Sequence, residues 1–125
     1  MMSRGFPNCF FMGGMQSAVT PNFMELYNEQ SRHLAYIIQE GIKGGLSSLE
    51  PSQQAETDWV RTITQGADSR ASFQTDCTPG YYNNEGKPGE GPGWFGGNYA
   101  GGAQQFFELL ADWRAKGDLA GIETG

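Results

Sequence analysis

Residues 4–14 read Arg4-Gly5-Phe6-Pro7-Asn8-Cys9-Phe10-Phe11-Met12-Gly13-Gly14, and this stretch decides the fold that we expect. The apolar run from Cys9 to Met12 predicts a strand buried on both faces, as in a parallel sheet. The glycine pair that follows lets the backbone turn sharply. Ligands of open α/β sheets bind beyond the carboxyl ends of strands, so this turn is a candidate ligand site. The rest of the sequence predicts hardly any partner strand.

Helical periodicity follows the turn. Thr20 as N-cap and Pro21 as first helical residue predict a helix over residues 21–43, whose apolar side chains recur close to every 3.6 residues. Residues 46–50 are expected to be extended, and a second helix is expected over residues 52–65. Both helices carry an apolar stripe too narrow to close a core between them, so we expect them to pack on something larger.

Residues 76–102 differ from the rest, because nine of the 19 glycines lie there together with five aromatic residues. A loop of this length without periodicity is either functional or disordered. We interpret it as an ordered, mobile binding loop, since linkers seldom carry so many aromatic residues. A last helix is expected over residues 103–115. The chain therefore divides into residues 1–45, 46–75, 76–102 and 103–125.

Composition narrows the function classes. The net charge of −6 and the pI near 4.6 argue against a nucleic-acid partner, which requires a basic face. No apolar run is long enough for a membrane span. Cys9 and Cys77 lack metal-ligand spacing and are expected to be reduced thiols of a cytoplasmic protein, with Cys9 a small buried hydrophobe. A chain with 19 glycines and 38% hydrophobic residues is expected to fold poorly alone.

The sequence contains no complete catalytic site and no metal site. His33, the single histidine, lies mid-helix among polar residues and is expected to be solvated or partly packed. The first helix begins soon after Gly13-Gly14, so its N–H groups could receive an anionic or carbonyl-bearing ligand. The alternative, an ordinary strand-to-helix turn, fits the residues equally well.

Three blocks of sequence carry a family resemblance. Residues 4–11, followed by Gly13-Gly14-Met15-Gln16-Ser17, resemble the GFPN-x-FF…G-x-Q-S segment near the end of Baeyer–Villiger monooxygenases, flavoproteins that use FAD and NADPH. Residues 77–87 resemble a loop of the branch that includes steroid and large-ring ketone monooxygenases. The ending, with Phe106-Phe107-Glu108-Leu109-Leu110 and Trp113-Arg114-Ala115, is also similar.

The resemblance implies an α/β fragment: the last strand of a Rossmann-like FAD domain, two helices, a long glycine-rich loop and a C-terminal helix. Catalytic residues and nucleotide-binding glycine motifs would lie upstream, outside this chain. Met1-Met2-Ser3 fits a gene model truncated at an internal methionine. We therefore expect a C-terminal portion that is inactive alone.

The resemblance also implies roles for individual residues. Those beside the flavin would be Gly14, Met15, Gln16 and Met24, and those lining the substrate pocket would be Val19, Thr20 and Pro21. A mobile lid over NADP and substrate would contain Thr78, Tyr81, Asn83 and Lys87. Two positions depart from the family pattern: Met15 stands where a proline is common, and Thr78 stands where many relatives have a tryptophan.

The implied reaction is insertion of one oxygen atom of O₂ next to a ketone carbonyl, which gives an ester or lactone. FAD and NADP would be the cofactors and a small ketone the substrate. A first alternative is a small binding or interaction module derived from such an enzyme. A second is a segment of the related N-hydroxylating flavoproteins, which the GFPN block disfavours.

Overall fold

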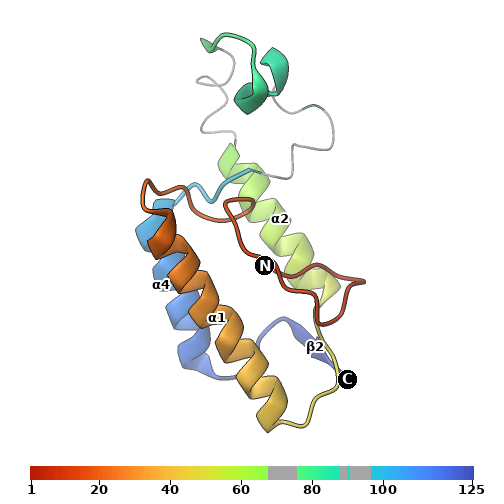
Figure 1. Cartoon of the computed structure of the whole chain (residues 1–125). Coiled ribbons are helices and arrows are strands. Elements are labelled where there is room, and N and C mark those ends of the chain that lie inside the picture. The colour runs from red at the N-terminus through yellow and green to blue at the C-terminus, as the bar shows by residue number, and fades with distance from the viewer. Residues whose placement is uncertain (68–75, 88–89, 91–96) are drawn as a thin grey trace.

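The computed structural model describes residues 1–67, 76–87, 90 and 97–125, and its main body is built from helices with a small two-stranded sheet at one end (Figure 1). In chain order the described elements are α1 (Phe23–Lys43), β1 (Leu49–Pro51), α2 (Gln53–Ala67), the 3₁₀ helix η2 (Tyr81–Gly86), α4 (Gly102–Lys116) and β2 (Ile122–Thr124). The helices expected over 21–43, 52–65 and 103–115 are thus confirmed, with ends shifted by one or two residues.

Helix α1 begins two residues later than expected. Asn22 is its N-cap, and the Asn22 side chain accepts a hydrogen bond from the backbone N–H of Glu25. Thr20, expected as the cap, accepts a hydrogen bond from the backbone N–H of Asn22 at 3.1 Å. The threonine hydroxyl therefore orders the residue that caps the helix, rather than the helix itself.

Helices α1 and α4 lie side by side and run in the same direction, whereas α2 runs opposite to them (Figure 1). The helices meet in a small apolar core. Its buried members are Ala18, Leu26, Phe106 and Leu110, against which Met1, Trp59, Tyr99, Ala103 and Phe107 pack. The core thus joins the first and last parts of the described chain, and the larger body on which the helices were expected to pack stays a prediction.

The short sheet joins the two ends of the chain. Strands β1 and β2 pair antiparallel, with Leu49 opposite Thr124 and Pro51 opposite Ile122. The extended piece expected over 46–50 appears as β1, shifted to later residues. Strand β2 was not expected, because three residues that include Glu123 give no readable alternation of apolar and polar side chains.

The buried strand expected over Cys9–Met12 is wrong for this structure. Residues 9–12 form no strand, Cys9 is exposed, and Phe11 and Met12 are 45% and 46% exposed. A strand buried on both faces needs hydrogen-bonded neighbours, and the described strands β1 and β2 pair with each other instead. Asn8 anchors the segment, since it donates to Leu49 O (2.9 Å) and its side-chain oxygen accepts from Leu49 N (3.0 Å).

Residues 76–87 lie apart from the helical body (Figure 1). They fall within the loop expected over 76–102, and η2 is the regular element in this part of it. Residues 88–89 and 91–96 of that loop, and the last residues of the expected segment 46–75, lie outside the described residues. No helix in the described part of the chain is long and apolar enough to span a membrane.

Candidate functional site

The turn after the glycine pair is held by a buried side chain of α1. Gln30 is fully buried; its Oε1 accepts from Gly13 N at 3.0 Å, and its Nε2 donates to Gly13 O at 2.9 Å. The same Nε2 lies 3.2 Å from the Ser17 hydroxyl, which donates to Gly13 O. Sequence reasoning missed Gln30. The sequence did contain a signal for it: Gln30 is a polar residue on the apolar stripe of α1, one helical turn from both Leu26 and Leu34.

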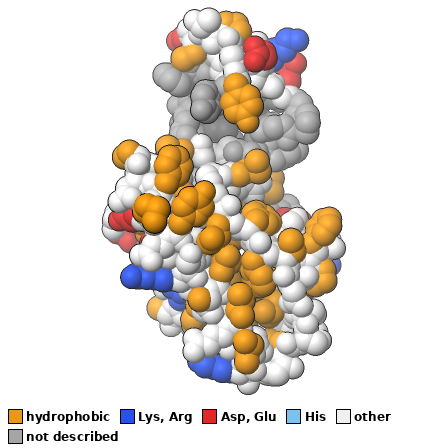
Figure 2. Space-filling model, viewed as in Figure 1, with side chains coloured by type: hydrophobic (Ala, Val, Ile, Leu, Met, Phe, Trp, Pro, Cys, Tyr) orange, Lys and Arg blue, Asp and Glu red, His pale blue; other side chains and the backbone are white. Residues whose placement is uncertain are grey.

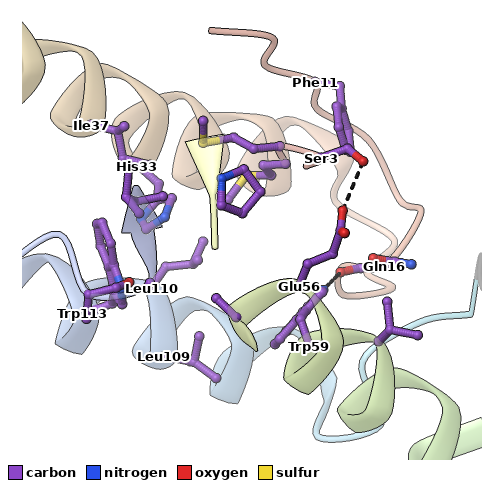
Figure 3. A pocket seen from close by; sticks show the side chains of 18 of the residues that line it. Ser3, Phe11, Gln16, His33, Ile37, Glu56, Trp59, Leu109, Leu110 and Trp113 are labelled. Carbon is purple, nitrogen blue, oxygen red and sulfur yellow. Dashed lines mark hydrogen bonds between the residues drawn. The ribbon is translucent and has the colours of Figure 1, made fainter. Parts of the chain in front are cut away.

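The opposite side of the turn is held by residues 97–99, which run alongside residues 14–17. Asn98 Nδ2 donates to Gly14 O (2.7 Å), Gln16 N donates to Gly97 O (3.0 Å) and Tyr99 N donates to Ser17 O (2.8 Å). From α2, Trp59 Nε1 donates to Gln16 O at 3.2 Å (Figure 3). Three separate parts of the chain, α1, α2 and residues 97–99, therefore fix the backbone of this turn.

The expected cofactor and pocket residues divide by exposure. Met15 is 71% and Met24 78% exposed, Gln16 is half-buried, and Gly14 has open space where a Cβ would stand. Of the expected substrate-pocket residues, Val19 (57%) and Pro21 are exposed and Thr20 is buried. With Phe23, 59% exposed, these side chains leave an apolar surface beside the start of α1. Hydrophobic side chains gather widely on one face of the body (Figure 2).

The positive end of α1 is already partly satisfied from within the chain. The Asn22 side chain takes one backbone donor, and the carboxylate of Glu25 lies in the first turn. Both compensate the helix dipole. The expected anion-binding helix terminus is therefore weakened, and the turn at residues 13–17 is the stronger candidate.

Asn83 organises the segment 76–87 rather than reaching outward. The Asn83 side chain is 7% exposed; its oxygen accepts from Gly80 N (2.8 Å) and Gly86 N (3.2 Å), and its nitrogen donates to Cys77 O and Thr78 O. Of the other expected lid residues, Thr78 and Lys87 are exposed and Tyr81 is 89% exposed. These three side chains are accessible to a ligand, while Asn83 shapes the loop that carries them.

Asn83→Ala is expected to loosen this loop without affecting the helices. The change leaves buried backbone groups unpaired, at a cost of about 1–3 kcal/mol, so limited proteolysis within residues 76–87 should speed up about tenfold. Thr78→Ala, an exposed change in the same segment, is the control. Equal cleavage rates in the two variants, or a fall in the helical melting temperature of the Asn83 variant alone, would contradict the assignment.

A cavity of about 350 Å³ lies between α1, α2, α4 and the first residues of the chain (Figure 3). Its walls are mostly apolar and include Ile37, Trp59, Leu109 and Trp113. Glu56 adds a carboxylate, which already accepts from the Ser3 hydroxyl at 3.0 Å and from the backbone N–H of Arg4 at 2.9 Å. Sequence reasoning did not find this cavity, because its walls come from segments far apart in the chain.

His33 lines the cavity and is buried, at 8% exposure, whereas it was expected to be solvated or partly packed. Its ring packs on Trp113 with centroids 4.9 Å apart, and no hydrogen bond to its buried Nδ1 is seen in the described part of the chain. Burial, then the positive charge of Arg114, then the N-terminal amine, lower the pKa of His33 to about 4. Burial also lowers the pKa of the Met1 amine to about 6. His33 is therefore neutral at pH 7.

No cluster of metal-ligating side chains occurs within the described residues. The described residues thus form a rigid turn next to an exposed apolar surface, an apolar cavity whose wall includes Met15 and Gln16 of that turn, and a loop with three accessible side chains. This arrangement can present backbone groups and apolar walls to a ligand.

Comparison with known proteins gives relatives at substantial identity, although no protein-family model matches the chain. Pentalenolactone D synthase of Streptomyces arenae is 41% identical over 119 residues, which is 95% of this chain and 20% of that protein. A Baeyer–Villiger monooxygenase of Streptomyces coelicolor is 38% identical over 115 residues. An FAD-binding monooxygenase of Hypomyces subiculosus is 37% identical over 121 residues.

Solved structures agree with these relatives. A polycyclic ketone monooxygenase from Thermothelomyces thermophila superposes with a TM-score of 0.82 at 30% identity, covering 99% of this chain and 20% of that chain. A closed crystal structure of cyclohexanone monooxygenase superposes with a TM-score of 0.77 at 24% identity, over 99% of this chain and 22% of that one. This second likeness shows the fold alone.

The order of the helices and the small sheet therefore define the C-terminal part of a ketone-monooxygenase fold. The chain belongs to the Baeyer–Villiger monooxygenases, as its sequence motifs indicated, and corresponds to the C-terminal portion of the relatives. It spans about a fifth of the length of the relatives that it matches.

Proposed function

We propose that this chain supplies one wall of the flavin and substrate site of a Baeyer–Villiger monooxygenase. The complete enzyme would insert one oxygen atom of O₂ beside a ketone carbonyl, with FAD and NADPH held mainly by the other four fifths of the protein. Bound FAD would supply the oxygen chemistry, which protein side chains cannot perform. The residues of this chain would position and shield it.

The observation that carries the proposal is the turn at residues 13–17. Buried Gln30, Trp59 and residues 97–99 fix its backbone, while Met15 on the same turn is 71% exposed. A rigid backbone with an outward face suits close approach by a planar ring system. Gly14 adds to the fit, because a Cβ at this position would meet no protein atom within 4 Å and glycine leaves that space open.

The neighbouring surface suits the substrate side of the same site. Val19, Phe23 and Met24 present exposed apolar side chains beside the turn, as a hydrophobic ketone would require. Thr20, buried behind them, holds the start of α1 in place. The exposed side chains of Tyr81 and Lys87 would belong to the segment that covers the site when it closes.

A chimera tests the proposal. In the chimera, this 125-residue chain replaces the matching C-terminal portion of pentalenolactone D synthase from Streptomyces arenae. The chimera is expected to retain FAD and to convert a ketone into an ester or lactone that carries one oxygen atom from ¹⁸O₂. The same enzyme without any C-terminal portion is the control and should lack product. A chimera that folds but neither retains FAD nor forms product would refute the proposal.

Gly14→Ala separates a ligand-facing glycine from a structural one. The new methyl group has free space and Gly14 does not have a left-handed backbone, so thermal stability is expected to stay within about 1 kcal/mol of the parent. FAD affinity of the chimera should fall about tenfold or more, since the methyl group occupies the space of the flavin edge. Gly80→Ala, whose Cβ would make one ordinary contact, serves as control. Unchanged FAD affinity in the Gly14 variant would remove Gly14 from the site.

A further inference from the structure

We propose that Gln30 is a positioning residue, which sets the backbone orientation of the turn that faces the flavin. The proposal rests on the function proposed above. Gln30 lies on α1, inside the core, and has no access to the surface from which a cofactor would approach. It would therefore act through the turn and not by touching the cofactor or the substrate.

The side-chain amide of Gln30 pairs with the main chain as a neighbouring strand would. It accepts from Gly13 N at 3.0 Å and donates to Gly13 O at 2.9 Å, so both backbone groups of one residue are satisfied by one side chain. A further contact of 3.2 Å ties the same nitrogen to the Ser17 hydroxyl. Gln30 thus joins the beginning and the end of the turn at a single buried point.

The chemistry of this contact requires an amide. Gly13 has a φ of +146°, a conformation that residues other than glycine rarely adopt, and it has no side chain of its own to hold it. Its N–H needs an acceptor and its carbonyl a donor, and glutamine offers both from one planar group. An apolar residue would leave the N–H unpaired and the carbonyl with only the Ser17 hydroxyl of its donors Gln30 and Ser17, whereas a carboxylate would satisfy the N–H and repel the carbonyl oxygen.

The orientation of the turn determines which backbone groups the exposed residues after Gly13 would present to the flavin. Gly14 and Met15 follow directly, and their backbone can rotate only as far as the contacts on either side allow. Loss of the Gln30 amide would remove the contacts that hold Gly13 at the start of the turn. The contacts of Trp59 and residues 97–99 with the rest of the turn would remain. The turn would then persist but reorient, which changes geometry at the flavin more than it changes overall folding.

Two variants of the chimera test the assignment, with Gln54→Met as matched control. Gln54 is an exposed helical glutamine whose amide contacts Asp58. In Gln30→Met, we expect an altered visible circular dichroism of the flavin and an at least tenfold lower yield of ester per NADPH consumed. Gln30→Glu should show the same loss at pH 8 and recover as the pH falls, because a protonated carboxyl group again both donates and accepts.

A role in folding alone would not give this pattern. Parent-like flavin spectra and yields in both Gln30 variants would overturn the proposal, as would an equal loss at every pH in Gln30→Glu. If the parent chimera folds but neither retains FAD nor forms product, the proposed function fails, and hydrogen exchange on the 125-residue chain still decides about Gln30. There, Gln30→Met should speed the exchange of amides 13–17 about tenfold relative to Gln54→Met, and equal rates would refute the contact.

Discussion

Replacing Phe106 with alanine is expected to lower the free energy of unfolding by about 3–5 kcal/mol, because it removes the central aromatic ring of the core. Phe106 is 2% exposed and lies on α4 where three other rings meet it. Ring centroids are 6.2 Å from Trp59, 6.0 Å from Tyr99 and 6.3 Å from Phe107. Native domains are stable by only about 5–15 kcal/mol, so this change should remove a large share of the total stability.

Leu109→Ala is the matched control for Phe106→Ala. Leu109 lies on the same helix but is 39% exposed, so its truncation should cost about 1 kcal/mol or less. Urea denaturation followed by far-ultraviolet circular dichroism measures both variants. If the two variants lost the same stability, the core would not be centred on Phe106, and the packing of α2 on α4 would have to be revised.

Acidification from pH 7 to pH 4 is expected to reduce stability by up to about 3 kcal/mol through His33 alone. The ordinary pKa of histidine is 6.5, and burial, aided by Arg114 and the N-terminal amine, lowers the pKa of His33 to about 4. Between these values the unfolded chain binds a proton that the folded chain does not. Stability is therefore full above pH 6.5 and is lost as the pH falls toward 4.

The comparison with His33→Gln isolates this effect. Glutamine does not titrate, while the Met1 amine, whose lowered pKa also makes stability fall on acidification, remains in both proteins. Urea unfolding at several pH values should give a steeper loss below pH 6.5 for the parent. Parallel pH profiles would show that His33 is not buried in its neutral form. Arg114, whose positive charge helps to lower the pKa of His33, also pairs with Glu29 at 3.6 Å and so joins α4 to α1.

Local periodicity was enough to predict the helices, because α1 and α4 carry apolar stripes that tertiary packing then uses. Thr20 was expected as the N-cap, but Asn22 takes this role, and either residue type could make the side-chain contact that defines the cap. The strand expected over residues 9–12 failed for a different reason. Its apolar run suits a sheet, but a strand exists only with a partner, which a local pattern cannot specify.

The residues expected at the site came from a family motif, and their roles stay predictions. Residues 14–16 and Met24 were named from the sequence, and the structure leaves Met15 and Met24 exposed. Gln30 was not named, because a polar residue on an apolar stripe does not reveal which distant backbone it satisfies. Asn83 was expected as a member of a mobile lid loop, and the structure shows its side chain to be the buried centre of that loop. Both are long-range or loop contacts that no periodicity encodes.

As proposed above, this chain would form one wall of a flavin site, and the remainder of the enzyme would supply the other walls. The most direct measurement is the flavin content of the purified 125-residue chain after incubation with FAD and removal of free flavin, read from visible absorbance. We expect the 125-residue chain to be colourless and the chimera, prepared in the same way, to be yellow. One tightly bound FAD per 125-residue chain would contradict the proposal.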